Sequence, residues 1–459
     1  MIYSKKNFSK LTALFFSIYT TIFLTIPAVR NYESSAWRMI IDRLLANQIY
    51  GADSFGKFLL IFPEKSKEFV SQKFYDLGVV NNRDMFSIDF SNYAAPEVYT
   101  SQFGLIGNIG TLLQGAFSFS PEAFYLIMST LTIFGSSVIA AILCLTIWEL
   151  FGKSASRITV LVMISPWPML FSSNFYYSMF LNMLFLFLPR AVVSILEKRD
   201  LTRYRDISVT LIVFITTLIF SLTNYTYVTV WVSCTILGIL LSTEEGRIPV
   251  STYIKVVTGQ LFAVALAIGM HLLKLSDYVA HSKNQNWLEY ILKNKIGVSN
   301  SSVTSEYLES ASKSPLQVID QYLRESLLSP LVQDRIPNLA WLFTGYMALS
   351  IATLVFLYLI LNGEVHSNRL RNSVKLIQLA LIGPATWLLL MRPHSWDNIQ
   401  VNYIFMFMPL IPIVLGSLIG LTSLSPIKLD RLQIGAVHKF ALPYFLCLVI
   451  ASYLIFFIL

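Results

Sequence analysis

The acidic residue Glu33 directly follows the first long apolar run of the chain, in the stretch YESSAWRMIIDRLL. A carboxylate at a membrane surface can act as a general base toward the hydroxyl group of an acceptor. An ordinary acidic residue at the polar edge of a membrane helix is the alternative interpretation. Further along the same stretch, Arg38 and Asp42 are spaced by one helical turn, so they form either an ion pair on a helix surface or part of a site.

A second polar stretch, APEVYTSQFGLIG at residues 95–107, contains Glu97, Tyr99 and Gln102 ahead of a glycine-rich run. The run itself, around residues 103–117, is short for a membrane span, so we expect a re-entrant or interfacial helix there. These side chains would then lie at one edge of the membrane.

A third stretch, LMRPHSWDNIQVNY at residues 390–403, contains Arg392, His394 and Asp397 at another membrane edge. An arginine at a membrane surface suits a lipid phosphate, because its planar guanidinium group pairs with two oxygens of an oxyanion at once. A nearby histidine adds a second donor or a proton. Arg392 and His394 are candidates for binding the phosphate of a membrane-anchored donor; a snorkelling arginine and a capping histidine are the alternatives.

The composition indicates which elements must position these residues. The 459-residue chain is 55% hydrophobic and only 13% charged, whereas soluble domains are about 25% charged. It contains several apolar stretches of about 20 residues, enough to cross a hydrocarbon core of about 30 Å. A transmembrane β-barrel would instead show alternating segments of about 10 residues. The predicted fold is an all-α polytopic membrane protein.

Hydropathy predicts about 11 membrane-spanning helices. They are expected at residues 11–29, 123–150, 158–172, 175–196, 207–223, 225–242, 255–273, 338–361, 374–391, 401–421 and 440–459. The first has a basic start and a long apolar run without a small-residue cleavage site, so it is predicted to be a retained signal-anchor.

Lysine and arginine residues are concentrated in the short loops on the side of the N-terminus, which is therefore predicted to be cytoplasmic. Residues 1–459 then form one integral membrane domain with two long extracytoplasmic segments, residues 30–122 and 274–337. Arg190 lies near the inner end of the span 175–196, so its side chain is predicted to snorkel toward the membrane surface.

Both long segments are predicted to contain helices that lie along the membrane. Residues 34–49 have apolar side chains at helical spacing, and FGKFLLIFP at residues 55–63 is expected to form a second interfacial helix. In the other segment, SPLQVIDQYLRESLLSPLVQDRIPN reads as an amphipathic helix punctuated by prolines.

The positions of the basic residues and of the cysteines argue against two classes of protein, nucleic-acid-binding proteins and zinc-binding proteins. The formal net charge is +8, but the basic residues lie in loops between spans and not on one patch, which argues against nucleic-acid binding. Cys144, Cys234 and Cys447 all lie in apolar segments, where small core side chains are expected. No Cys/His cluster has the spacing of a zinc site.

The order of these features resembles that of the GT-C superfamily of polyprenyl-phosphate-sugar-dependent glycosyltransferases, which includes protein O-mannosyltransferases and lipid A aminoarabinose transferases. The resemblance lies in YESSAWRMIIDRLL after the first span, in SPEAFYLIMSTLTIFGSSVIAAILCLTIWELFG, and in RPHSWDNIQVNYIFMFMPLIP. It covers about the first half of the chain and residues 390–412.

The resemblance implies a GT-C-like bundle and an inverting transfer of a sugar from a polyprenyl-phosphate donor to an extracytoplasmic acceptor. The reaction would serve cell-surface glycan or glycolipid synthesis, with a bacterial inner membrane as the expected location. Glu33 would be the general base, and Arg392 and His394 would hold the donor phosphate. Contacts to the acceptor or the sugar are expected from Asp42, Glu97, Tyr99, Gln102 and Asp397.

The implied partners are the lipid-linked sugar, a glycan, lipid or protein acceptor, and membrane lipid. No cofactor is required, although Glu33 with Asp42 or Asp89 could hold a divalent metal ion. A polysaccharide polymerase or ligase is the nearest alternative, with arginine-rich outer loops as its mark. A flippase or transporter would place ionisable residues deep within the spans, and in a non-catalytic assembly subunit Glu33 would be dispensable.

Overall fold

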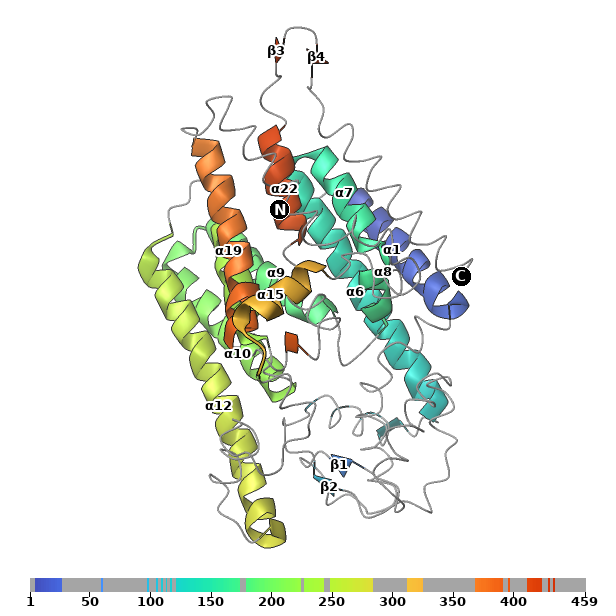
Figure 1. Ribbon diagram of the computed structural model, residues 1–459, viewed down its shortest axis with the longest axis vertical. Coiled ribbons are helices and arrows are strands. Elements are labelled where there is room, and N and C mark those ends of the chain that lie inside the picture. Colours follow the sequence, from blue (N-terminus) through green and yellow to red (C-terminus); the bar gives the residue numbers. More distant parts are fainter. Residues whose placement is uncertain are drawn as a thin grey trace.

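The computed structural model describes residues 5–26, 59–60, 97–98, 105, 109, 113, 116–117, 121–173, 179–223, 227–242, 248–283, 312–324, 368–390, 395–396, 411–422, 428–429 and 432–433. Helices make up almost all of these residues, and the strands are two-residue pairs (Figure 1).

The described helices are α1 Lys5–Thr25, α6 Pro121–Phe151, α7 Lys153–Met163, α8 Pro166–Phe171, α9 Met179–Lys198, α10 Arg205–Thr223, α11 Val228–Leu240, α12 Val250–Lys283, α15 Pro315–Arg324, α19 Asn368–Leu390 and α22 Ile411–Thr422, with the 3₁₀ turn η4 at Thr202–Tyr204. The strands are β1 Leu59–Leu60, β2 Glu97–Val98, β3 Lys428–Leu429 and β4 Leu432–Gln433, and they pair β1 with β2 and β3 with β4, both antiparallel.

Four helices of the described part are long and apolar enough to cross a membrane. They cover Asn7–Thr25, Leu126–Phe151, Thr202–Thr223 and Val250–Leu273. The prediction of an all-α membrane protein is confirmed at this level, whereas the number of about 11 spans remains a prediction. The helices α6 and α12, of 31 and 34 residues, are about 46 and 51 Å long. Both therefore extend beyond a hydrocarbon core of about 30 Å.

The other predicted spans agree with the described helices to different degrees. Helix α9 covers most of 175–196, and α19 covers most of 374–391. Helix α11, at 13 residues, is shorter than the predicted span 225–242. The predicted spans 338–361 and 440–459 lie outside the described residues.

The predicted single span at 158–172 is wrong. Helix α7 ends at Met163, and α8 begins at Pro166 after a break at Ile164 and Ser165. Proline has no N–H to continue the helical ladder and disfavours helical geometry in the residue before it. Two hydrogen bonds connect Ser165 back to α7: its N–H and its hydroxyl both donate to the carbonyl of Val162, at 3.1 and 2.6 Å.

The interfacial helix predicted over residues 55–63 is wrong at Leu59 and Leu60. These residues form β1, whose Leu59 is opposite Val98 and whose Leu60 is opposite Glu97 in β2. Short apolar runs of leucine, isoleucine and phenylalanine fit a strand as well as a helix, so periodicity alone does not separate the two. The predicted helix at 34–49 lies outside the described residues.

Helices α9 and α11 run in the same direction and pack closely in the middle of the bundle. Near their starts, the indole N–H of Trp231 donates to the side-chain oxygen of Asn182 at 2.7 Å, which pairs two buried polar groups. The same indole stacks on Phe185, with ring centroids 5.0 Å apart. Further along, Gly238 permits close contact, because a Cβ there would overlap the carbonyl oxygen of Leu186.

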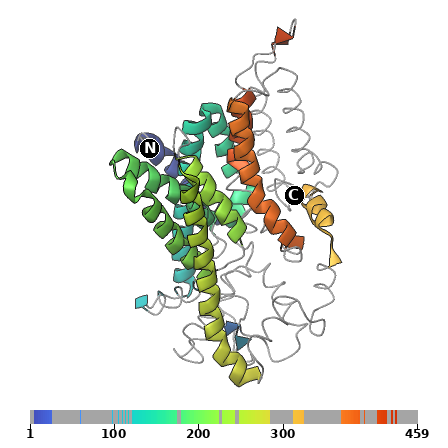
Figure 2. The same cartoon turned by 90° about the vertical axis from the view of Figure 1, so that its left-hand side faces the viewer.

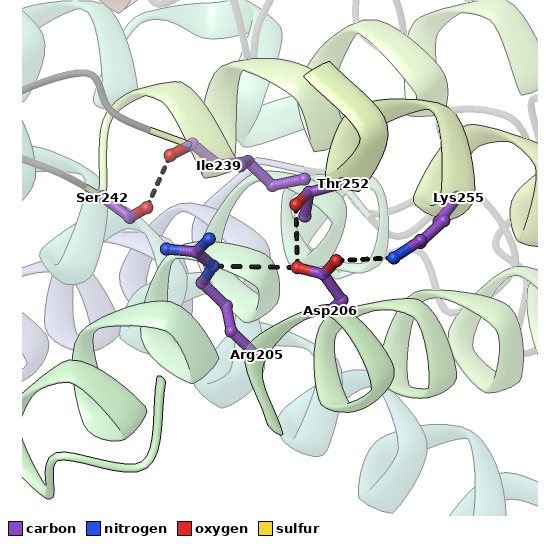
Figure 3. Close-up of polar contacts among 6 residues, drawn as sticks. All are labelled: Arg205, Asp206, Ile239, Ser242, Thr252 and Lys255. Atoms are coloured by element: carbon purple, nitrogen blue, oxygen red, sulfur yellow. Dashed lines mark hydrogen bonds and ion pairs between the residues drawn. The ribbon is translucent and has the colours of Figure 1, made fainter. Parts of the chain in front are cut away.

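Helices α10 and α12 also run in the same direction, and an ionic cluster joins their first turns (Figure 3). Asp206 accepts hydrogen bonds from Thr252 at 2.7 Å and from Lys255 at 2.9 Å. The guanidinium group of Arg205 lies 3.9 Å from the same carboxylate. An acid in the first turn also complements the positive N-terminal end of a helix, so the cluster fixes the register of the two helices at this end.

Figures 1 and 2 place the β1–β2 pair at the end of the molecule where α12 finishes, and the β3–β4 pair at the opposite end. The predicted topology assigns residues 95–107 to one side of the membrane and the loop that contains Lys428 to the other. That these two ends face opposite sides of a membrane remains a prediction.

Candidate functional site

Helix α15 lies in the second long segment, and its sequence defines where it begins. Pro315 occupies the first helical position, where its missing N–H costs nothing. Ser314 and Gln317 form a capping box, in which the Ser314 N–H donates to the Gln317 side chain at 2.7 Å and the Gln317 N–H donates to the Ser314 hydroxyl at 3.3 Å. The amphipathic helix predicted in this segment is therefore confirmed over Pro315–Arg324.

One face of α15 is buried against the bundle. Val318 and Tyr322, one turn apart, are 0% and 4% exposed and belong to the main hydrophobic core. On the other side, Leu316 is exposed, and Arg324 pairs with Asp320 at 2.7 Å across one turn. The apolar face and the polar face thus follow from helical spacing.

Tyr322 connects α15 to the stretch at residues 390–403. Its hydroxyl donates a buried hydrogen bond of 2.8 Å to the carbonyl oxygen of Ser395. The next residue, Trp396, packs against the core and lies under the ammonium group of Lys313, which is 4.6 Å from the centroid of the ring. Two segments far apart in the sequence are therefore joined by a hydrogen bond and a cation–π contact.

The last turns of α19, just before this stretch, are held by the start of α11. Thr229 donates to the carbonyl of Gly383 at 3.0 Å. The rings of Tyr227 and Trp387 lie 5.6 Å apart, centroid to centroid. The C-terminal part of α19 is therefore held against the start of α11.

The structure describes the site residues predicted from the sequence only in part. Glu97 lies in β2, opposite Leu60, so the 95–107 stretch is paired with the 55–63 stretch. The other predicted residues lie outside the described part of the chain: Glu33, Asp42, Tyr99, Gln102, Arg392, His394 and Asp397. Of the 390–403 stretch beyond α19, the structure describes Ser395 and Trp396, next to His394 in the sequence.

Two residues that the sequence analysis did not single out connect this region, Tyr322 and Ser395. Tyr322 follows Val318 by one turn on the apolar face of α15, so helical spacing would have placed it in the core but not opposite Ser395. Ser395 lies inside the RPHSWDN motif. Its position in the motif could have suggested it, whereas its burial could not be predicted.

The prediction that Arg190 snorkels to the surface is wrong. Its side chain is only 6% exposed and donates to the Glu149 carboxylate at 2.9 Å and to the carbonyl of Leu241 at 2.7 Å. Leu241 is the C-cap residue that follows α11, where a helix presents unpaired carbonyls and a partial negative charge. The guanidinium group of Arg190 therefore finds two hydrogen-bond acceptors inside the bundle, the Glu149 carboxylate and the Leu241 carbonyl. It does not need to reach the membrane surface for partners.

Within the described ranges, no group of three or more His, Cys, Asp or Glu side chains is placed to hold a metal ion. The carboxylates that the sequence analysis named as metal ligands, Glu33, Asp42 and Asp89, lie outside those ranges.

The described geometry thus joins the second long segment to the stretch that contains Arg392 and His394, and joins two parts of the first long segment to each other. Comparison of the whole chain with protein-family models, curated proteins and solved structures finds no match.

Proposed function

We propose that the protein is an inverting glycosyltransferase that moves a sugar from a polyprenyl-phosphate donor to an acceptor on the extracytoplasmic face of a bacterial inner membrane. The acceptor would be a glycan, a lipid or a protein, and the reaction would serve cell-surface glycan or glycolipid synthesis. The resemblance of YESSAWRMIIDRLL and RPHSWDNIQVNYIFMFMPLIP to the corresponding parts of GT-C enzymes supports the reaction class.

One structural observation supports the proposal above all. Tyr322 of α15 contacts Ser395, and Lys313, two residues before α15, contacts Trp396. A glycosyltransferase of this kind needs its phosphate-binding groups held rigidly where the lipid headgroup arrives. The stretch that contains Arg392 and His394 is anchored at its middle by these two contacts.

In the proposed reaction, Glu33 removes the proton of an acceptor hydroxyl as the hydroxyl oxygen attacks the anomeric carbon of the sugar. The bond from that carbon to the phosphate oxygen breaks, and polyprenyl phosphate leaves with the electron pair. Arg392 and His394 stabilise the negative charge that develops on the leaving phosphate. Attack from the face opposite the phosphate inverts the anomeric configuration.

A transporter would use ionisable groups deep within the bundle. One buried ionisable side chain among the described residues is His271 of α12, and another is Arg190 of α9. Its contacts to Glu149 and to the end of α11 give it a structural role without a transported ion. A polymerase or ligase would share the lipid-linked donor but would extend a larger glycan.

The variant Glu33→Gln tests the proposed reaction in cells that lack the native gene. It keeps the size of the side chain and removes the base, so glycan modification is expected to be lost. The matched control is Asp320→Asn, which removes a partly exposed carboxylate of α15 and is expected to retain modification. Full modification by the Glu33→Gln protein would overturn the mechanism.

A further inference from the structure

The hydroxyl group of Ser395 is buried and has no partner among the residues that the structure describes. Ser395 is 0% exposed, and its Oγ makes no hydrogen bond to any residue that the structure describes. A buried hydroxyl without a partner loses its bonds to water and gains nothing in return. Such a group in a native protein therefore calls for an explanation.

Several buried hydroxyls of the bundle avoid this cost, although others, such as those of Ser129 and Thr217, also have no partner among the described residues. Ser137 donates to the carbonyl of Ile133 at 2.7 Å, and Thr159 donates to the carbonyl of Ala155 at 2.9 Å, both one helical turn back. Ser395 makes no such bond in the described structure, so its hydroxyl is left available to a molecule that binds there.

The position of Ser395 is fixed on both sides of its hydroxyl. Its own carbonyl oxygen accepts the hydrogen bond from Tyr322, and Trp396 is held between the core and Lys313. The residue before it in the sequence is His394. Ser395 is thus a fixed donor without a partner among the described residues, next in sequence to a candidate phosphate-binding histidine, and a fixed donor is what a preorganised anion site requires.

We propose that the hydroxyl of Ser395 binds an oxyanion by donating a hydrogen bond to a phosphate oxygen, and that Tyr322 is the positioning residue that holds Ser395 in place. The inference rests on the proposed function, in which Arg392 and His394 bind the phosphate of the lipid-linked donor. A lipid phosphate and free inorganic phosphate share this chemistry, so the experiment includes both.

The full-length protein in detergent is titrated with farnesyl phosphate, with inorganic phosphate, and with farnesol as the uncharged control. The variant Ser395→Ala removes only the hydroxyl. We expect it to bind farnesyl phosphate roughly tenfold more weakly than the unchanged protein. Its melting temperature without ligand is expected to be equal or higher, because an unpaired polar group has been removed.

Ser417→Ala is the matched control. Ser417 of α22 is also 0% exposed and its Oγ also has no partner among the described residues, but it lies outside the 390–403 stretch. Its replacement is expected to leave farnesyl phosphate binding unchanged. Equal binding by the unchanged protein and Ser395→Ala, equal losses in both variants, or no binding of either phosphate by the unchanged protein would each overturn the proposal.

Tyr322→Phe tests the positioning role. Alone it is expected to weaken farnesyl phosphate binding, and combined with Ser395→Ala it is expected to add no further loss, since it acts through Ser395. Additive losses would overturn the positioning role. Equally strong, Ser395-dependent binding of inorganic phosphate would support the site with free phosphate as its ligand.

The failure of this inference can be told apart from the failure of the proposed function. Glu33→Gln is expected to abolish sugar transfer and to retain farnesyl phosphate binding. Ser395-dependent binding in a protein that transfers no sugar would support the oxyanion site and overturn the proposed function. Sugar transfer by a protein whose farnesyl phosphate binding does not depend on Ser395 would support the proposed function and overturn the oxyanion site.

Discussion

At the scale of single residues, Arg190 is the clearest case of a side chain whose role depends on its neighbours. The sequence places it toward one end of a span, where a long cationic side chain usually reaches the surface. In the structure it instead joins α9 to Glu149 of α6 and to Leu241 at the end of α11. Three helices are therefore tied together by one guanidinium group.

We expect Arg190→Met to lower the free energy of unfolding by about 1–3 kcal/mol. The variant keeps much of the apolar volume but leaves the end of α11 without its cation; the cost stays below that of breaking a fully buried pair, because Glu149 is 46% exposed. Thermal unfolding in detergent measures the change.

Glu149→Gln is the control for this prediction. It removes the carboxylate and keeps the bond from Arg190 to the Leu241 carbonyl, so a smaller loss is expected. A melting temperature of Arg190→Met equal to that of the unchanged protein would show that the contact does not stabilise the bundle.

At the scale of elements, the close packing of α9 on α11 depends on Gly238. A methyl group at this position would overlap the backbone carbonyl of Leu186, and backbone atoms cannot move aside as a flexible side chain can. We expect Gly238→Ala to cost about 2 kcal/mol or more, in the range of overpacked cores, as measured by thermal unfolding.

Gly269→Ala in α12 is the matched control. A Cβ there meets nothing within 4 Å, so the substitution is expected to be neutral or to stabilise by up to about 1 kcal/mol through helix propensity. Equal melting temperatures for the two variants would contradict the close contact between α9 and α11.

The sequence predicted the elements better where a pattern is long than where it is short. Apolar runs of about 20 residues located the apolar parts of α1, α6, α10 and α12 to within about five residues, although α12 itself continues to Lys283. The break between α7 and α8 was readable from Pro166, but hydropathy averages over such a break. Leu59 and Leu60 lie in a run too short to separate strand from helix.

From the sequence, the chemistry of the candidate site can be proposed, but the contacts that bring its segments together cannot be predicted. The types of Arg392 and His394 suit phosphate binding, and this role stays a prediction because both residues lie outside the described part of the chain. That α15 would pack beside Ser395 depends on contacts between segments 73 residues apart, which local patterns do not encode. The burial of Ser395 follows from this packing and could not be predicted.

At the scale of the whole molecule, the two strand pairs lie at opposite ends (Figure 1), so the predicted orientation can be tested directly. In intact cells, a membrane-impermeant thiol reagent is expected to label Val98→Cys. It is expected to label Lys428→Cys only after the membrane has been permeabilised. Both variants carry Cys447→Ser, and Cys144 and Cys234 are buried, so background labelling is expected to be low. The reverse labelling pattern would invert the topology.

The central claim, sugar transfer from a lipid-linked donor with Glu33 as the base, is tested most directly by following release of polyprenyl phosphate. Purified protein in proteoliposomes is given a panel of polyprenyl-phosphate sugars together with an extract of membrane acceptors. We predict acceptor-dependent release by the unchanged protein, reduced roughly a hundredfold or more in Glu33→Gln, since a general base contributes about 10²–10⁴ in rate. Release by Glu33→Gln at the rate of the unchanged protein, or no release from any donor of the panel, would contradict the account.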